Sequence, residues 1–144
     1  MKMYCLPEVL FTERLKKDGI VIVQSGSASI SENDVFTSIY HTLNKVFPHV
    51  FPYVTYIPSY ALPWGFCMAT HNPSNLDIPG EEIDARINAK ITGNLRFYDS
   101  ITHHSLFNLP KYLRTDIQRQ RRIIQDKDPL MEHYPGISVE STTP

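Results

Sequence analysis

The fold is decided by a short apolar stretch near the N-terminus, which reads GIVIVQSG over residues 19–26. Four consecutive β-branched residues with no polar residue between them are typical of a strand buried on both faces, as in a parallel sheet. The small residues after Gln24 predict a loop at the carboxyl end of this strand. Ligands of open α/β sheets bind at such ends. Gln24 is therefore a candidate site residue, although it could equally well satisfy backbone groups of the turn.

Helix and strand patterns alternate outward from this strand. The sequence predicts helices over residues 7–18, 32–46, 81–91, 99–107 and 110–122. It predicts strands over 49–58 and 64–70, and a short extended piece over 95–98. The connection between the two strands is too short for a helical crossover, so they are expected to be antiparallel neighbours. This order indicates an α/β protein, the second half of an open sheet. Residues 1–123 are expected to form its body and 124–144 an irregular tail.

Composition fits one soluble domain, with 144 residues, 42% of them hydrophobic, and a net charge of −1. The near-neutral charge argues against a nucleic-acid partner. No apolar run is long enough for a membrane span, and the N-terminus lacks the apolar core of a signal peptide. We therefore expect a cytoplasmic protein that binds no membrane. The separated cysteines, Cys5 and Cys67, predict neither a disulfide framework nor a zinc site.

Motifs for a resident cofactor are absent from the sequence. No two glycines are closer than seven positions, so no dinucleotide- or phosphate-binding loop can be built. Adjacent His103 and His104 are expected to point apart on a helix, which argues against metal binding. The basic segment 111–127 could bind an anion, but a solvated helix face explains it better. Asp126 and Asp128 lie in the expected tail, where a general base would lack fixed geometry. We therefore expect no metal and no tightly bound cofactor.

Two aromatic residues stand close together in the connection IPSYALPWGF over residues 57–66. A cation over an aromatic face gains about 0.5–2 kcal/mol, and the hydroxyl of Tyr60 can accept a hydrogen bond from an ammonium group. Together with Trp64, this connection could hold an organic amine. Judged on residue types alone, packing of a hairpin end is the simpler explanation.

Four stretches in the same order resemble the polyamine aminopropyltransferases, the spermidine synthase family. They are VIVQSG at 21–26, VFPHV at 46–50, YIPSYALPWGF at 56–66, and a C-terminal signature running from LRFYD to FNLPKYL over 95–113. The resemblance implies the C-terminal half of a Rossmann-like, methyltransferase-type sheet with an antiparallel terminal strand pair and C-terminal helices. Generic methyltransferase sheets lack the tyrosine loop and the C-terminal signature, which argues against a fragment of another protein of that type.

The resemblance also implies an activity and a set of partners. The family transfers an aminopropyl group from decarboxylated S-adenosylmethionine to an amine such as putrescine or agmatine. Tyr60 matches the tyrosine that contacts the amine, Gln24 matches a glutamine lining the same pocket, and Trp64 would form a nearby wall. The implied partners are a polyamine or diamine substrate and further copies of the chain in a homo-oligomer.

Departures from the family pattern concern the other half of the active site. In the family, the glycine-rich loop and the catalytic aspartate of an Asp-x-x-Asp-Pro motif precede the strand found here at 20–23. We therefore assign no catalytic residue and expect the nucleotide co-substrate only in a complete enzyme. The chain would be a truncated or split enzyme, completed by an N-terminal half chain, or a non-catalytic binding or interaction module derived from that fold. Either would leave an apolar strand edge as a partner surface.

Overall fold

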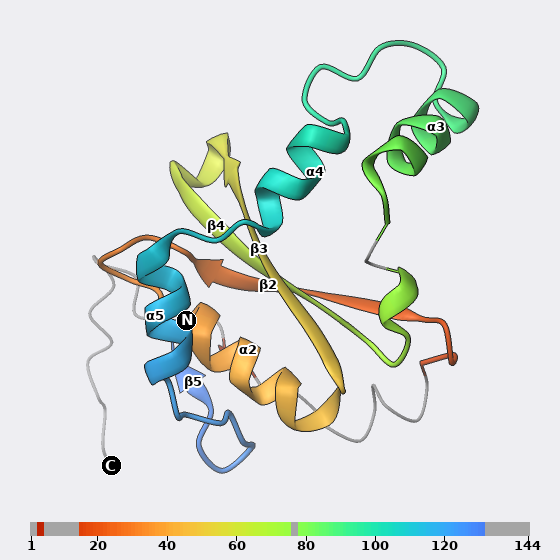
Figure 1. The fold of residues 1–144 in the computed structure, drawn as a ribbon. Helices are drawn as coiled ribbons and strands as arrows, with labels where there is room; N and C mark the ends of the chain where they lie inside the picture. Colours follow the sequence, from red (N-terminus) through yellow and green to blue (C-terminus); the bar gives the residue numbers. More distant parts are fainter. Residues whose placement is uncertain (1–2, 5–14, 76–77, 132–144) are drawn as a thin grey trace.

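The computed structural model describes residues 3–4, 15–75 and 78–131 (Figure 1). The strands and helices are β1 (Met3–Tyr4), β2 (Ile20–Ser27), α2 (Asp34–Val46), β3 (His49–Ile57), β4 (Leu62–Thr70), α3 (Gly80–Lys90), α4 (Ser100–Phe107), α5 (Lys111–Arg119) and β5 (Leu130–Met131). Most of the helix predicted over 7–18 lies outside the described residues, and residues 15–18 are not helical. No helix in the described ranges is long and apolar enough to cross a membrane.

Strands β2, β4 and β3 form a three-stranded sheet in that order (Figure 1). Strand β4 is antiparallel to both neighbours, which confirms the predicted pairing of the strands over 49–58 and 64–70. Because β2 and β3 both oppose β4, they run parallel to each other, and α2 connects them across one face. The predicted parallel pairing of β2 itself is wrong for the described residues, where its sheet neighbour is the antiparallel β4.

Within the described part of the chain, strand β2 is covered on one face, not on both as the sequence predicts. Val21 and Val23 are partly buried and pack against the core, whereas Ile20 is 40% and Ile22 is 56% exposed. Alternate side chains of a strand point to opposite faces, and α2 covers only one of them. The run of β-branched residues therefore predicts the strand correctly but not the burial of its two faces.

The hydrophobic core lies between α2, the sheet and α5. Its fully buried members include Phe36 and Ile39 from α2, Cys67 from β4 and Leu113 from α5. The Phe36 ring lies directly on the backbone of Gly65, where an added Cβ would approach the ring to 2.5 Å. The apolar face predicted for residues 32–46 is thus the buried face of α2. Within the segment predicted as a tail, Ile124 is fully buried and β5 pairs with β1.

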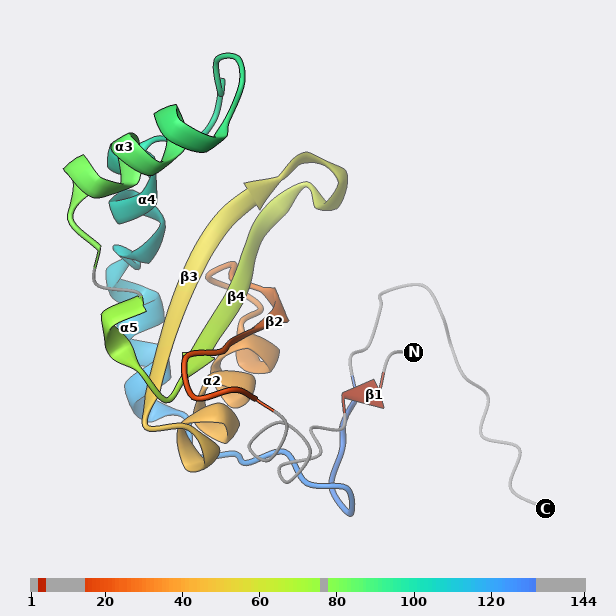
Figure 2. The ribbon, with the colours of Figure 1, turned by 90° about the vertical axis from the view of Figure 1, so that its right-hand side faces the viewer.

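Helices α3 and α4 form an arm, residues 80–107, that extends to one side of the sheet (Figure 2). Phe107 of α4 packs on Tyr53 of β3, with ring centroids 5.3 Å apart. Helix α3 packs on α4, and the carboxylate of Asp84 accepts hydrogen bonds from the backbone and hydroxyl of Ser100. The extended piece predicted over 95–98 forms no strand; it belongs to an exposed link over 91–99.

Burial of the Cys67 thiol makes the folded chain less stable at alkaline pH. Desolvation raises the pKa of Cys67 from 9.0 to about 12, against a smaller lowering by a hydrogen bond with Ser25. The folded chain therefore holds a proton that the unfolded chain releases above pH 9. This contribution to the free energy of unfolding is complete below pH 9 and is lost as pH rises towards 12, by at most about 1.4 kcal/mol per pH unit.

Urea unfolding at pH 8, 9.5 and 11 measures this loss. We expect Cys67→Ala to show a shallower decline than the parent chain, because tyrosines common to both variants cancel in the comparison. Equal slopes for the two proteins would contradict the assignment to Cys67.

Candidate functional site

Gln24 and Tyr60, which are 36 positions apart in sequence, meet in the second half of β2. The strand continues to Ser27, so the loop predicted directly after Gln24 is wrong. The side-chain amide of Gln24 donates to the Tyr60 hydroxyl at 3.4 Å. Gln24 is the last residue of β2 in regular register with β4, before an irregularity between Gln24 and Ser27. Both side chains are exposed, so their polar groups are accessible to a ligand. Figure 2 shows the β3–β4 hairpin, which carries Tyr60, reaching past the end of β2.

Trp64 completes a cluster of the three residues that the sequence predicted. Its ring lies against Tyr60, with centroids 4.4 Å apart and planes inclined by 46°. Tyr60 is 42% exposed, whereas Trp64 is 9% exposed and forms the buried side of the cluster. The Trp64 indole nitrogen is buried and has no hydrogen-bond partner among the described residues. A buried unpaired donor costs about 1–3 kcal/mol.

The local sequence explains why Tyr60 turns towards β2. Pro58 begins a 3-10 turn, η1 (Pro58–Tyr60), because its fixed φ suits the first position of such a turn. Ala61 follows with a φ of 56°, a left-handed conformation that is rare for residues other than glycine. The Ala61 backbone donates to the Pro58 carbonyl at 3.2 Å, which closes the turn. The turn therefore holds Tyr60 over the end of the sheet.

Two aromatic residues that the sequence analysis did not select extend the cluster across the sheet. Phe66 is the register partner of Gln24 on one side and of Tyr53 on the other, so all three lie on the same face. The Phe66 and Tyr53 rings stack with centroids 5.1 Å apart. Desolvation raises the pKa of Tyr53, with smaller contributions from Cys67 and Tyr98. The two-residue period of both strands was the signal that could have placed them beside Gln24.

The adjacent histidines of α4 do not point apart as the sequence predicts. The rings of His103 and His104 meet edge to face with centroids 5.4 Å apart. The Nδ1 of His103 forms a 2.7 Å hydrogen bond with the Tyr98 hydroxyl. Desolvation, followed by the charge of His104, lowers the pKa of His103. Tyr98 and His103 are only five positions apart, one before and one within α4, so their side chains can meet. Their hydrogen bond attaches the exposed link over 91–99 to α4.

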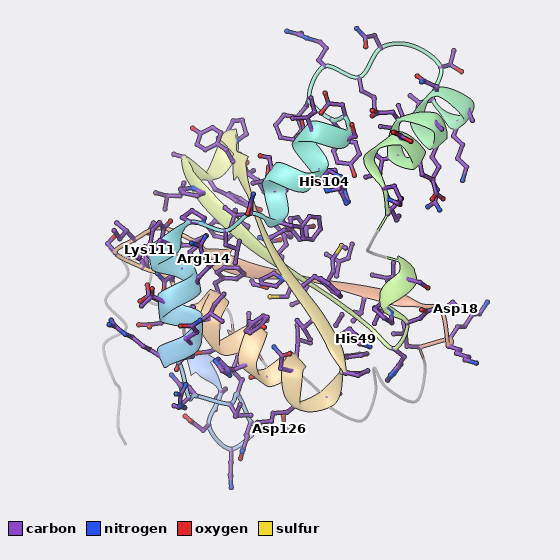
Figure 3. All side chains as sticks on the ribbon, in the orientation of Figure 1. Asp18, His49, His104, Lys111, Arg114 and Asp126 are labelled. Carbon is purple, nitrogen blue, oxygen red and sulfur yellow. The ribbon has the colours of Figure 1, made fainter. Side chains whose placement is uncertain are left out.

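The other sequence candidates lie apart from this cluster. Lys111 and Arg114 project from α5, on the side of the molecule away from α3 (Figure 3). The Arg114 guanidinium donates to the Leu109 carbonyl, and Arg122 pairs with Asp128 at 3.0 Å. These local contacts favour the reading of segment 111–127 as a structural surface. A polar hollow of about 360 Å³ between α2 and α5 includes Asn33, whose amide donates to Asp116 at 3.0 Å.

Comparison with known proteins identifies the family. Residues 9–78, which include all three residues of the cluster, match the spermine/spermidine synthase domain. The chain is 37% identical over 133 residues to a polyamine aminopropyltransferase of Sulfolobus acidocaldarius. The chain belongs to the spermine/spermidine synthase family. More distant family members include the thermospermine synthase ACAULIS5 of Arabidopsis thaliana, which is 29% identical over 126 residues.

Solved structures of the family share the fold. A spermidine synthase from Thermotoga maritima superposes with a TM-score of 0.60 at 20% identity. A spermidine synthase in complex with the transition-state analogue AdoDATO superposes with a TM-score of 0.56 at 22% identity. These superpositions confirm the expected α/β fold.

The chain spans only part of these family members. It covers 43% of the Sulfolobus protein and 37% of the Arabidopsis protein, although 85% and 87% of this chain are aligned. It covers 36% of the Thermotoga chain, with 74% of its own residues superposed. The comparison thus places the chain within one portion of the family fold.

Proposed function

We propose that the chain forms the amine side of an aminopropyltransferase. The reaction would move an aminopropyl group from decarboxylated S-adenosylmethionine to an amine such as putrescine or agmatine. The observation that carries this proposal is the contact of Gln24 with Tyr60 beside Trp64, in a chain of the spermine/spermidine synthase family. Residues distant in sequence converge on one side of the sheet, and their exposed polar groups can reach the same ligand.

The chemistry assigns separate tasks to the three side chains. A neutral amine attacks the carbon next to the sulfonium, the carbon–sulfur bond breaks, methylthioadenosine leaves, and a base takes the amine proton. The Gln24 carbonyl accepts a hydrogen bond from the amine, the Tyr60 hydroxyl accepts another, and its ring favours a cationic centre. Trp64 excludes water behind them. Their role is alignment of the attacking nitrogen, because neither an amide nor an indole removes a proton at neutral pH.

A chimera tests this function. The aligned portion of the Sulfolobus aminopropyltransferase is replaced by this chain, and aminopropyl transfer is measured with putrescine and with agmatine. We expect turnover with at least one amine, and a strongly raised amine KM when Gln24 and Tyr60 are both replaced by alanine. A folded chimera that neither binds an amine nor forms product would overturn the proposal and favour a non-catalytic binding module.

The chain of 144 residues is expected to bind decarboxylated S-adenosylmethionine weakly by itself. Its six glycines are too far apart for a phosphate- or nucleotide-cradling loop. Isothermal titration calorimetry should therefore detect no binding at micromolar concentration. An assay of aminopropyl transfer should detect no activity. Tight nucleotide binding by this chain would show that the nucleotide site lies at least partly within it.

An N-terminal half chain is the partner that this function implies. In the described residues β2 has a sheet neighbour on one side only, and Ile20 and Ile22 are exposed beside that free edge. Unpaired strand edges readily accept another strand. Mixing the chain with the preceding portion of the Sulfolobus enzyme should restore transfer activity, and Ile22→Lys should weaken that recovery. Recovery that is insensitive to Ile22→Lys would place the contact elsewhere.

A further inference from the structure

Residues 58–61 form the tip of the β3–β4 hairpin, and two energetically unfavourable features meet there. Ala61 has a φ of 56°, the single positive φ of a residue other than glycine in the described ranges. In this left-handed conformation the Cβ of an L-residue crowds the following carbonyl oxygen. The second feature is the indole nitrogen of Trp64, which is buried and has no partner among the described residues. Both features belong to one contact, because the ring of Tyr60, the residue before Ala61, lies on Trp64.

Weak contacts hold the tip in this arrangement, which we call closed. Ile57 and Leu62 form the last pair of the β3–β4 ladder, so the four residues of the tip lie outside the sheet. Among the described residues, the hydrogen bond that reaches the tip from elsewhere is the one from Gln24 to Tyr60. At 3.4 Å it is exposed and longer than the usual range of about 2.7–3.2 Å. The closed tip therefore depends on its own backbone.

The backbone freedom of the tip is greatest at its carboxyl end. The pyrrolidine ring of Pro58 fixes φ at the first position of the tip. Ala61 joins the tip to β4, and its backbone donates to the Pro58 carbonyl at 3.2 Å only in the present conformation. A change of Ala61 to a negative φ relieves the crowding at its Cβ and breaks this hydrogen bond. The same change moves Tyr60 off Trp64 and admits water to the buried indole nitrogen.

We propose that Ala61 is a positioning residue of the amine site, because its left-handed backbone holds Tyr60 closed over Trp64 and beside Gln24. The proposal rests on the proposed amine function, since the closed tip is the form that binds the amine. The side chain of Ala61 is exposed, so a substitution there acts on the backbone and not on packing. When only the closed fraction binds, the apparent affinity for the amine falls with that fraction. Saturating amine keeps the tip closed, so kcat stays unchanged.

Acrylamide quenching of Trp64, the one tryptophan of the chain, measures closure of the tip without any activity assay. Ala61→Val should raise the quenching constant about twofold or more, because positive φ is strongly disfavoured for a β-branched residue. Ala61→Gly and Ala61→Asn should not exceed the parent value, since both residues adopt positive φ readily. Tyr60→Ala gives the value of an uncovered indole. Leu62→Val is the matched control, because it places the same side chain one position later, within β4.

The chimera with the Sulfolobus enzyme connects closure of the tip to the amine. Ala61→Val should raise the amine KM by about tenfold and leave kcat and the nucleotide KM within about twofold, whereas Ala61→Asn should keep all three near the parent values. Circular dichroism checks that each variant is folded, and Ala61→Thr repeats the test with a β-branched residue that adds less apolar surface.

Three results would overturn the proposal. The first is quenching of Ala61→Val equal to that of the parent or of Leu62→Val. The second is an equal rise for Ala61→Asn and Ala61→Val, which would assign the effect to side-chain size instead of φ. The third is a quenching response without a change in the amine KM. A parent chimera that forms no product would refute the amine function, and with it the amine role of Ala61, while the quenching series still decides whether Ala61 holds Tyr60 closed.

Discussion

Replacing Phe36 by alanine is expected to lower the free energy of unfolding by about 3–5 kcal/mol. The ring is fully buried and lies on the Gly65 backbone, so its removal leaves a cavity between α2 and the central strand. Urea unfolding, followed by far-ultraviolet circular dichroism and by the fluorescence of the chain's one tryptophan, Trp64, measures the loss. A change below about 1 kcal/mol would show that α2 does not pack as described.

Gly65→Ala examines the same contact from the strand. An added Cβ would approach the Phe36 ring to 2.5 Å, so overpacking should cost about 1–3 kcal/mol. The loss should be smaller than the sum of the two single effects when Gly65→Ala is combined with Phe36→Ala, because the methyl group then enters the space that the ring vacates. Strict additivity would contradict direct contact between these residues.

Tyr60→Ala in the chimeric enzyme is expected to raise the KM for the amine by about tenfold to a hundredfold. The change removes a cation-binding ring worth about 0.5–2 kcal/mol and a hydroxyl hydrogen bond worth about 1 kcal/mol. The KM for decarboxylated S-adenosylmethionine should stay within about twofold, since each tenfold change requires about 1.4 kcal/mol of lost interaction. Initial rates with each substrate varied in turn measure both constants.

Tyr56→Ala is the matched control for this substitution. Tyr56 stands on the same hairpin and is 60% exposed, but no ring or side-chain contact joins it to the Gln24–Tyr60 pair among the described interactions. Its replacement should leave the amine KM unchanged. Tyr60→Phe, which keeps the ring and removes the hydroxyl, should give an intermediate effect. Equal effects of Tyr56→Ala and Tyr60→Ala would assign the loss to the hairpin as a whole.

The elements that the sequence predicts well are those in which local pattern and packing agree. Helix α2 follows its apolar period because that face is buried on the sheet, and the short connection through Tyr60 permits only an antiparallel β3–β4 pair. The meeting of Gln24 and Tyr60 was predictable only through the family resemblance, since 36 positions separate the two residues. Secondary-structure propensity alone does not predict a contact between residues so far apart in sequence.

The errors arise where tertiary context overrides local pattern. The β-branched run of β2 indicated two buried faces, yet burial depends on what other elements cover, and Ile22 is 56% exposed. The extended piece over 95–98 contains strand-forming residues but lacks a neighbouring strand, so it remains an exposed link. Phe66 and Tyr53 lie within the strands predicted over 64–70 and 49–58, but only the register across β4 shows that they lie beside Gln24.

The most direct test of the proposed amine site is the amine KM of four chimeras at saturating nucleotide: the parent, Gln24→Ala, Tyr60→Phe, and the double variant. We expect each single change to raise the amine KM by about fivefold to tenfold, because each removes a polar group worth about 1 kcal/mol. The double variant should fall below the product of the two effects, because one hydrogen bond joins these side chains. Unchanged amine KM values, or an increase confined to the KM of the nucleotide, would contradict the assignment of this cluster to the amine.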